Sequence, residues 1–233
     1  MDISFLDEYI SQLVVVEDTD DLRISYIEKD SEFVVLSFSS TPPDNTRPHE
    51  QFITTLTNKS VTGIYVVDKK SSYGNGIDWI RIQNAVTAIA NGRKIVSVGY
   101  CMGATLAVIS TRYLPIPYVL GITPQYSIHP SILPKESFLN RWSDGIEEWK
   151  IPSLDGYINE KTDYVLLGTK NYDDVFQAGM FPQMDNIRHI TFDTTSHDLP
   201  RLIGSDLGEI MIDLISSDTI KNKFLNLIVK DTQ

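Results

Sequence analysis

A cysteine at the centre of a Gly-x-Cys-x-Gly pentapeptide is the residue whose type and setting most favour nucleophilic chemistry. The pentapeptide runs from Gly99 to Gly103, and Cys101 at its centre is the chain's single cysteine. This pattern is typical of a sharp turn between a strand and a helix, which lifts a nucleophile above the edge of a sheet. The alternative interpretation is a buried cysteine that fills space as a small apolar side chain.

A base and an acid are expected later in the chain, because sites of this kind follow the order nucleophile, acid, histidine. His197 follows the last expected strand, in a loop that gives an imidazole no packing role, so we expect it to be the general base. Asn171 stands where the acid usually lies after the strand at 164–168. We favour Asp174 as the acid and then Asp173, and N-capping of a helix is the alternative role for whichever is left.

A thiol in this setting changes the chemistry in a definite direction. A helix N-terminus and a neighbouring imidazole both lower the pKa of a cysteine, so Cys101 and His197 can rest as thiolate and imidazolium. Attack by the thiolate on an ester or thioester forms an acyl-thioester. The expected reaction is therefore acyl transfer through the sulfur of Cys101.

The oxyanion that forms during such an attack needs backbone N–H donors. Met102 is expected to supply one of them, because it opens the helix that follows the turn. The second donor is expected from the loop after the strand at 33–38, at Ser39, Ser40 or Thr41. The serine side chains themselves have the alternative role of turn formers.

Elements that alternate between strand and helix must position these residues. A mostly parallel sheet with helices on both faces is expected from that alternation. An excursion around 124–162 interrupts it and is expected to form a small lid over the sheet edge. The expected strands are 13–16, 23–28, 33–38, 63–68, 94–98, 118–123, 164–168 and 187–192. The expected helices are 49–58, one capped by Asp78, 102–113, 174–179 and 206–216, with a second helical stretch to Val229.

Length and composition fit one domain spanning 1–233, with 42% hydrophobic residues available for its core. A net charge of −11 argues against a nucleic-acid partner, which needs a basic surface. No apolar run approaches the roughly 18 residues that a membrane span requires, and the first residues do not form a secretory signal. With one cysteine, the chain is expected to be cytoplasmic. His49 and His129 have no second ligand at metal spacing, so no metal site is expected.

The segment from Val98 to Ala107 resembles the nucleophile turn of dienelactone hydrolases, whose usual form is Gly-Tyr-Cys-x-Gly-Gly, with Ala104 in place of the second glycine. A second resemblance covers more of the chain. The layout from Tyr73 through Asp78 and Trp79, the cysteine turn and Pro124 to Ser127 is similar to small hydrolase-fold proteins of bacterial surface-polysaccharide modification. Both resemblances imply an α/β-hydrolase fold. The dienelactone hydrolase resemblance also implies a cysteine-histidine-aspartate triad without metal or cofactor.

The sequence thus predicts a cysteine-dependent hydrolase of carboxylic esters, thioesters or lactones, with a small acyl compound as substrate. An acyltransferase would use the same residues and differ only in what resolves the acyl-enzyme. A non-catalytic accessory or binding protein that keeps the turn as architecture is the remaining alternative. A homodimer is compatible with the sequence.

Overall fold

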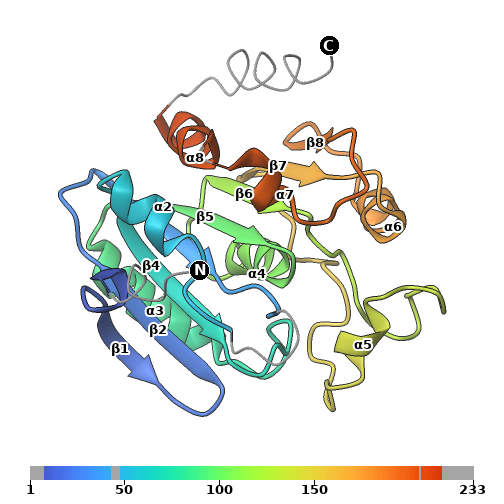
Figure 1. The fold of residues 1–233 in the computed structure, drawn as a ribbon. Coiled ribbons are helices and arrows are strands. Elements are labelled where there is room, and N and C mark those ends of the chain that lie inside the picture. The colour runs from blue at the N-terminus through green and yellow to red at the C-terminus, as the bar shows by residue number, and fades with distance from the viewer. Residues whose placement is uncertain (1–7, 43–47, 205, 217–233) are drawn as a thin grey trace.

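A computed structural model of the chain describes residues 8–42, 48–204 and 206–216 (Figure 1). At its centre lies an eight-stranded sheet in the order β1-β2-β4-β3-β5-β6-β7-β8. The strands are β1 (Val14–Asp18), β2 (Leu22–Ile27), β3 (Phe33–Phe38), β4 (Thr62–Asp68), β5 (Lys94–Tyr100), β6 (Tyr118–Ile122), β7 (Asp163–Gly168) and β8 (Ile187–Thr191). The β1–β2 and β2–β4 pairs are antiparallel, and all the others are parallel. The expected mostly parallel sheet is confirmed.

Burial on both faces explains the composition of the central strands. Every residue of β4 is buried, and β3 and β5 are nearly as enclosed. In the register, Leu36 of β3 lies beside Ile64 of β4 and Ser97 of β5. Continuous apolar, β-branched runs are what a parallel strand with helices on both sides requires.

Two hydrophobic cores cover the two faces of the sheet. The helices are α2 (Ile53–Asn58), α3 (Trp79–Ala90), α4 (Met102–Ser110), α5 (Asn140–Ser143), α6 (Tyr172–Met180), α7 (Leu199–Ile203) and α8 (Asp206–Ser216). On one face α3 and α4 contribute Ile82, Val86 and Leu106 to the first core. On the other face α2 and α8 contribute Leu56 and Ile210 to the second core. The helices thus cover both faces, as predicted (Figure 1).

Helix α4 is buried along its whole length, unlike the amphipathic α3. It packs against β3, β5 and β6, and the excursion lies on the same side of the sheet. Ile128, Leu139 and Leu154 of the excursion belong to the same core as α4. A helix enclosed by the sheet and the excursion holds its N-terminus, next to Cys101, in a fixed position.

Several element boundaries differ from the sequence-based expectation. Helix α2 begins at Ile53 rather than near residue 49, because Phe52 before it has a left-handed backbone with φ 62°. Helix α4 ends at Ser110, three residues early. Helix α7 was not predicted, since five residues are too few to show a helical period. The helical stretch expected from 217 to Val229 lies outside the described residues.

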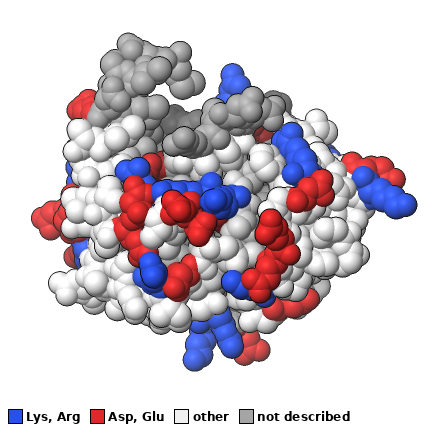
Figure 2. Space-filling view, turned by 90° about the horizontal axis from the view of Figure 1, so that it is seen from below, with Lys and Arg blue, Asp and Glu red and all other residues white. Residues whose placement is uncertain are grey.

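Acidic and basic side chains are interspersed over the face seen in Figure 2. Eight basic residues of the described segments form ion pairs with acidic neighbours, which divides the surface into small areas of alternating sign. Among the described residues, no helix combines the length and the apolar character that crossing a membrane demands.

Candidate active site

Cys101 occupies a strained turn between the end of β5 and the start of α4. Its φ of 53° and ψ of −124° lie in a region that side-chain-bearing residues rarely adopt. The turn is held by the backbone of the next strand, because the Cys101 N–H donates to the carbonyl of Ile122 at 2.9 Å. The strain therefore persists through the surrounding sheet and presents the side chain at the carboxyl edge.

The two glycines of the pentapeptide are required by close backbone contacts. A Cβ atom on Gly99 would lie 2.0 Å from the carbonyl oxygen of Gly103, and one on Gly103 would lie 2.4 Å from the carbonyl oxygen of Phe38. Neither position has room for a side chain, since real Cβ atoms do not approach backbone so closely. The Gly-x-Cys-x-Gly pattern thus lets α4 start directly over β3 and β5.

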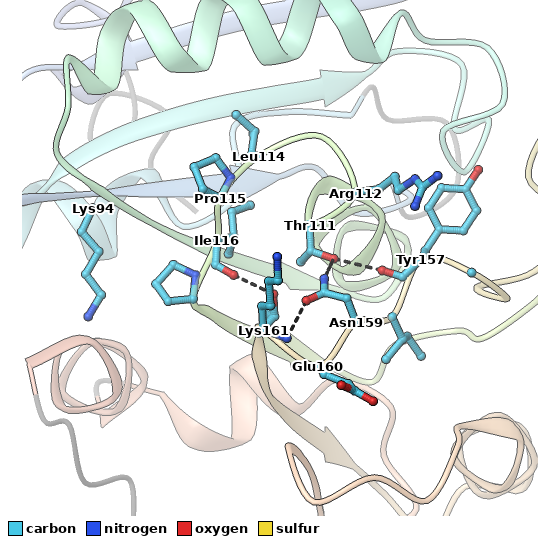
Figure 3. A pocket seen from close by; sticks show the side chains of 14 residues that line it. Lys94, Thr111, Arg112, Leu114, Pro115, Ile116, Tyr157, Asn159, Glu160 and Lys161 are labelled. Carbon is cyan, nitrogen blue, oxygen red and sulfur yellow. Dashed lines mark hydrogen bonds between the residues drawn. The ribbon is translucent and has the colours of Figure 1, made fainter.

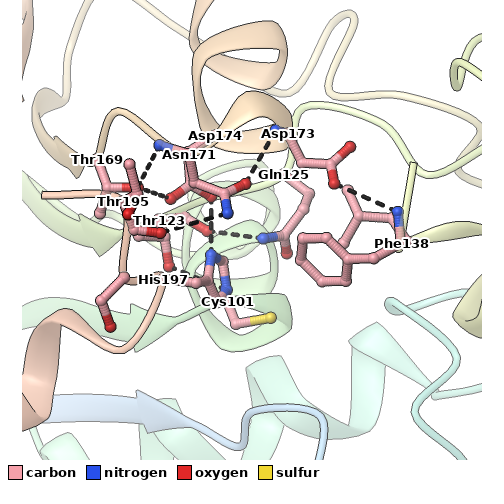
Figure 4. Close-up of polar contacts among 12 residues, drawn as sticks. Cys101, Thr123, Gln125, Phe138, Thr169, Asn171, Asp173, Asp174, Thr195 and His197 are labelled. Carbon is pink, nitrogen blue, oxygen red and sulfur yellow. Dashed lines mark hydrogen bonds and ion pairs between the residues drawn. The ribbon is translucent and has the colours of Figure 1, made fainter. Parts of the chain in front are cut away.

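His197 and Asp174 meet above this turn (Figure 4). Nδ1 of His197, in the loop after β8, lies 2.8 Å from Oδ1 of Asp174 in the first turn of α6. The other oxygen of Asp174 accepts a hydrogen bond from the hydroxyl of Thr169. Held on both oxygens, the carboxylate fixes the orientation of the imidazole, whose other nitrogen is on the side of Cys101 (Figure 4).

Asp173 points away from this imidazole although it is the neighbour of Asp174. Its Oδ2 accepts from the backbone N–H of Phe138 at 3.3 Å, and its Oδ1 is buried without a hydrogen-bond partner among the described residues. Asn171 is the N-cap of α6, with its side-chain oxygen accepting from the Asp173 N–H at 3.0 Å. Of the three acid candidates, Asp174 is the one that contacts His197.

Solved structures with similar folds come from esterases and an acetyltransferase. A capsule O-acetyltransferase of Neisseria meningitidis serogroup A matches with a TM-score of 0.64 and 14% identity, covering 86% of this chain and 93% of that one. An esterase of Pyrococcus furiosus matches with a TM-score of 0.59 and 14% identity over 90% and 92% of the two chains. Est1E from Butyrivibrio proteoclasticus gives 0.52 and 13% over 88% and 100%.

The chain has the α/β-hydrolase fold. At these identities the likeness concerns the fold and does not transfer an activity. No protein-family model matches the chain, and no curated protein matches it either. In this fold the loops after the parallel strands carry the chemistry, and Cys101, Asp174 and His197 follow β5, β7 and β8 at that edge.

The charges around Cys101 favour an ion pair between its thiolate and the imidazolium of His197. Burial raises the pKa of the Cys101 thiol, but its hydrogen-bonding and charge interactions with His197 outweigh burial, helped by Thr41 and the Met102 N–H. The pKa of the thiol therefore lies below its ordinary value. Burial lowers the pKa of His197, but Asp174 and Cys101 together raise it from 6.5 to about 10. A thiolate beside an imidazolium is the form these interactions stabilise.

The excursion covers the imidazole of His197 through Phe138. The Phe138 ring packs edge-on against His197 with centroids 5.7 Å apart, and the ring of Tyr100 lies 5.5 Å away on a tilted plane. The side chain of His197 is 19% exposed, and Cys101 is 4% exposed. These contacts keep most bulk water from the pair and strengthen its electrostatic interactions.

One expected oxyanion donor is wrong. The N–H of Ser39 donates to the carbonyl of Val66 at 3.0 Å, so it extends the β3–β4 ladder and has no bond left for a substrate. The Met102 N–H, by contrast, lies against the sulfur of Cys101. The amide of Ser40 has no acceptor within the described part of the chain and stays a candidate. The Thr41 hydroxyl lies 3.4 Å from the Cys101 sulfur.

Sequence reasoning missed several polar residues around the pair. Thr123 follows β6 with φ 46°, and its hydroxyl oxygen lies 3.4 Å from Nε2 of His197. Thr169 follows β7 and supports Asp174. Their positions directly after parallel strands were a usable signal, because such positions share one edge of the sheet.

A groove of about 810 Å³ lies elsewhere, at the amino ends of β5, β6 and β7 (Figure 3). Its lining includes Lys94, Arg112 and Lys161, and none of the predicted site residues. The strand directions place it at the edge opposite Cys101. In the described segments, no group of three or more His, Cys, Asp or Glu residues is arranged to hold a metal ion.

Proposed function

We propose that this chain is a hydrolase of carboxylic esters or thioesters that works through an acyl-enzyme on Cys101. The observation that carries the proposal is the contiguous arrangement of Cys101, His197 and Asp174 around a strained turn at the carboxyl edge. Fold neighbours that are named as esterases and as an O-acetyltransferase support acyl chemistry of this general kind.

Acylation begins from the ionic pair. The thiolate of Cys101 attacks the carbonyl carbon, a carbon–sulfur bond forms, and the carbonyl π electrons move to oxygen. In this mechanism the Met102 N–H and the Ser40 N–H donate to that oxyanion. Collapse of the intermediate breaks the bond to the leaving group, which takes the proton from Nε2 of His197 and departs as an alcohol or thiol.

Deacylation uses the same imidazole as a base. His197, now neutral and held through Nδ1 by Asp174, accepts a proton from water as the water oxygen attacks the thioester carbon. The carbon–sulfur bond breaks, the carboxylic acid leaves, and Cys101 returns to its thiolate. No metal or redox partner is needed for either half of the reaction.

Transfer of the acyl group to an alcohol is the second candidate. The restricted exposure of Cys101 and His197 beneath Phe138 favours it, because an acyl-thioester shielded from bulk water survives until a bound acceptor arrives. In that case the acceptor hydroxyl replaces water in deacylation. The capsule O-acetyltransferase among the fold neighbours agrees with this route.

The pH dependence of thiol alkylation tests the ionic pair without a known substrate. Iodoacetamide should modify Cys101 with an apparent pKa below that of free cysteine, and His197→Ala should remove the advantage. The protein has one cysteine, so the reaction needs no further assignment. A thiol that alkylates slowly at every pH in the native protein would overturn the proposal in favour of a structural cysteine.

Mass spectrometry of the intact protein tests the acyl-enzyme. A panel of short activated esters, thioesters and lactones should leave an acyl adduct on wild type and none on Cys101→Ala. Adding glycerol during turnover separates the two candidates, since an acyltransferase forms glycerol ester and a hydrolase forms free acid. If the folded Cys101→Ala variant still hydrolysed the panel at the wild-type rate, the sulfur would be excluded as the nucleophile.

A further inference from the structure

The residue that directly follows β6 has a strained backbone. Thr123 has a φ of 46°, and for a side chain branched at Cβ a positive φ is an outlier that costs free energy. The residue is also buried, with 2% of its surface exposed. Strain of this kind persists where the surrounding structure holds the residue in place, and it is concentrated at functional sites.

Hydrogen bonds on both sides hold the backbone of Thr123. Its N–H donates to the carbonyl of Leu167 in β7 at 2.6 Å, and its carbonyl accepts from Nε2 of Gln125 at 2.7 Å. Gln125 is tied in turn to α4, because the Thr105 hydroxyl accepts from its N–H at 3.1 Å and donates to its carbonyl at 2.8 Å. Strand β7 and helix α4 thus fix Thr123 relative to the turn at Cys101.

The hydroxyl of Thr123 lies beside the reactive nitrogen of the proposed base. Its Oγ1 is 3.4 Å from Nε2 of His197, whereas Nδ1 of the same ring contacts Asp174 (Figure 4). Strand β6, which ends one residue before Thr123, is the neighbour of β5, which ends one residue before Cys101. The hydroxyl therefore borders the place where a leaving group or an incoming nucleophile exchanges a proton with Nε2.

The protonation state of His197 decides how this contact acts. In the resting ion pair Nε2 carries a proton, so the oxygen of Thr123 is an acceptor. In the acyl-enzyme the imidazole is neutral, and Asp174 keeps the remaining proton on Nδ1, so Nε2 has a free lone pair. Nε2 and Oγ1 are then two acceptors side by side. A water molecule has two protons and can donate one to each.

We propose that Thr123 is a further catalytic residue, which orients the attacking water in deacylation. One proton of the water points to Nε2 of His197 and the other to Oγ1 of Thr123, so a lone pair of the water oxygen faces the thioester carbon. As the carbon–oxygen bond forms, Nε2 takes the first proton. The second proton stays on the oxygen and leaves with the carboxylic acid, while the carbon–sulfur bond breaks and its electrons return to sulfur. The inference rests on the proposed acyl-enzyme at Cys101.

This arrangement distinguishes water from an alcohol as the acyl acceptor. An alcohol has a single hydroxyl proton, and Nε2 of His197 takes it, so the alcohol oxygen has no proton left to donate to Thr123. The orienting contact is therefore available to water alone. Thr123 consequently favours hydrolysis of the acyl-enzyme over transfer of the acyl group, through the positioning of one reactant.

Thr123→Val tests the inference, because valine keeps the shape of the side chain and removes the hydroxyl. Decay of the acyl adduct in water, followed by mass spectrometry, should slow about tenfold, the size expected for one lost hydrogen bond. Formation of the adduct needs no water and should change by less than about twofold. With glycerol present, the ratio of glycerol ester to free acid should rise, whereas a misplaced His197 would lower both products together.

Three further variants make the test specific. Thr123→Ser returns a hydroxyl to the site and should restore most of the decay rate lost in Thr123→Val. Thr162→Val is the matched control, because it removes a buried threonine hydroxyl that donates to the carbonyl of Ile116 at the opposite edge. Thr123→Ala covers the case in which Thr123→Val fails to fold, since the smaller side chain lessens the strain of a positive φ.

The possible outcomes separate this inference from the proposed function. An acyl adduct that decays at the wild-type rate in a folded Thr123→Val or Thr123→Ala variant would overturn the role of Thr123 while the acyl-enzyme still stands. Equal slowing of adduct formation and decay would also overturn it, because it would indicate a structural role. If wild type forms no adduct with any member of the panel, the proposed function fails, and the inference fails with it.

Discussion

The two edges of the sheet differ in how their polar groups are used. At the amino edge, the groove is walled by a closed network. The hydroxyl of Thr111 lies 3.1 Å from that of Tyr164 and bonds the Asn159 side chain, and the Thr162 hydroxyl donates to the carbonyl of Ile116. The basic residues around it are exposed to solvent. The three hydroxyls of this network, from Thr111, Thr162 and Tyr164, all have hydrogen-bond partners.

The carboxyl edge is built in the opposite way. Cys101, Thr123 and Tyr73 all have positive φ, and Asp68 and Asp173 each bury one carboxylate oxygen that lacks a partner among the described residues. Backbone strain and incompletely satisfied polar groups are concentrated at this edge. The comparison shows that backbone strain and buried charge gather around the proposed site and not beside the groove.

Removing the nucleophile should give the largest effect and the sharpest contrast between the edges. Cys101→Ala is expected to lower the rate on an activated ester by at least about ten-thousandfold, because no other group can form the acyl-enzyme. The triple variant Lys94→Gln, Arg112→Gln, Lys161→Gln in the groove should keep the wild-type rate. Steady-state kinetics on both proteins checks this, and a groove variant as inactive as Cys101→Ala would reverse the comparison.

Neutralising Asp174 and Asp173 one at a time should separate an effect on catalysis from an effect on the packing of the excursion. Asp174→Asn is expected to reduce turnover by about a thousandfold, since the amide neither fixes the right imidazole tautomer nor balances its charge. Asp173→Asn should change turnover far less, because its partner is the Phe138 N–H. Equal losses in the two variants, measured with the same ester, would contradict the assignment of Asp174.

Glycine substitutions should destabilise the protein where an added Cβ would meet neighbouring backbone atoms. Gly99→Ala is expected to lower the free energy of unfolding by about 3 kcal/mol, because its Cβ would collide with the Gly103 carbonyl. Gly168→Ala meets nothing within 4 Å and should stay within about 0.5 kcal/mol of wild type. Denaturant unfolding measures both, and equal stabilities would show that the turn can relax around a side chain.

The pH dependence of stability should give the smallest effect. The pKa of His197 is raised from 6.5 to about 10 on folding, so the folded state binds its proton more tightly than the unfolded state. This stabilisation is complete below pH 6.5 and disappears as pH rises towards 10. The stability difference between wild type and His197→Gln should shrink across that window. Thr162→Val, which removes no titrating group, should show a constant difference.

The sequence by itself determined the turn and the order of the site. Gly99 is a local requirement, because its Cβ would meet the carbonyl of Gly103 four residues later, whereas the close neighbour of Gly103 is Phe38 of β3. The alternation of buried strands and helices follows from hydrophobic patterning, which is equally local. From these features followed the mostly parallel sheet and the placement of Cys101 after β5 and of His197 after β8.

The tertiary structure decided which neighbours face the sulfur. Asp173 and Asp174 are adjacent in α6, and adjacent helical residues project about 100° apart, so the path of the helix over the sheet selects one of them. Ser39 was lost as a donor because β4 takes its N–H. Such contacts join segments distant in sequence, and their directions exist only once the sheet has formed.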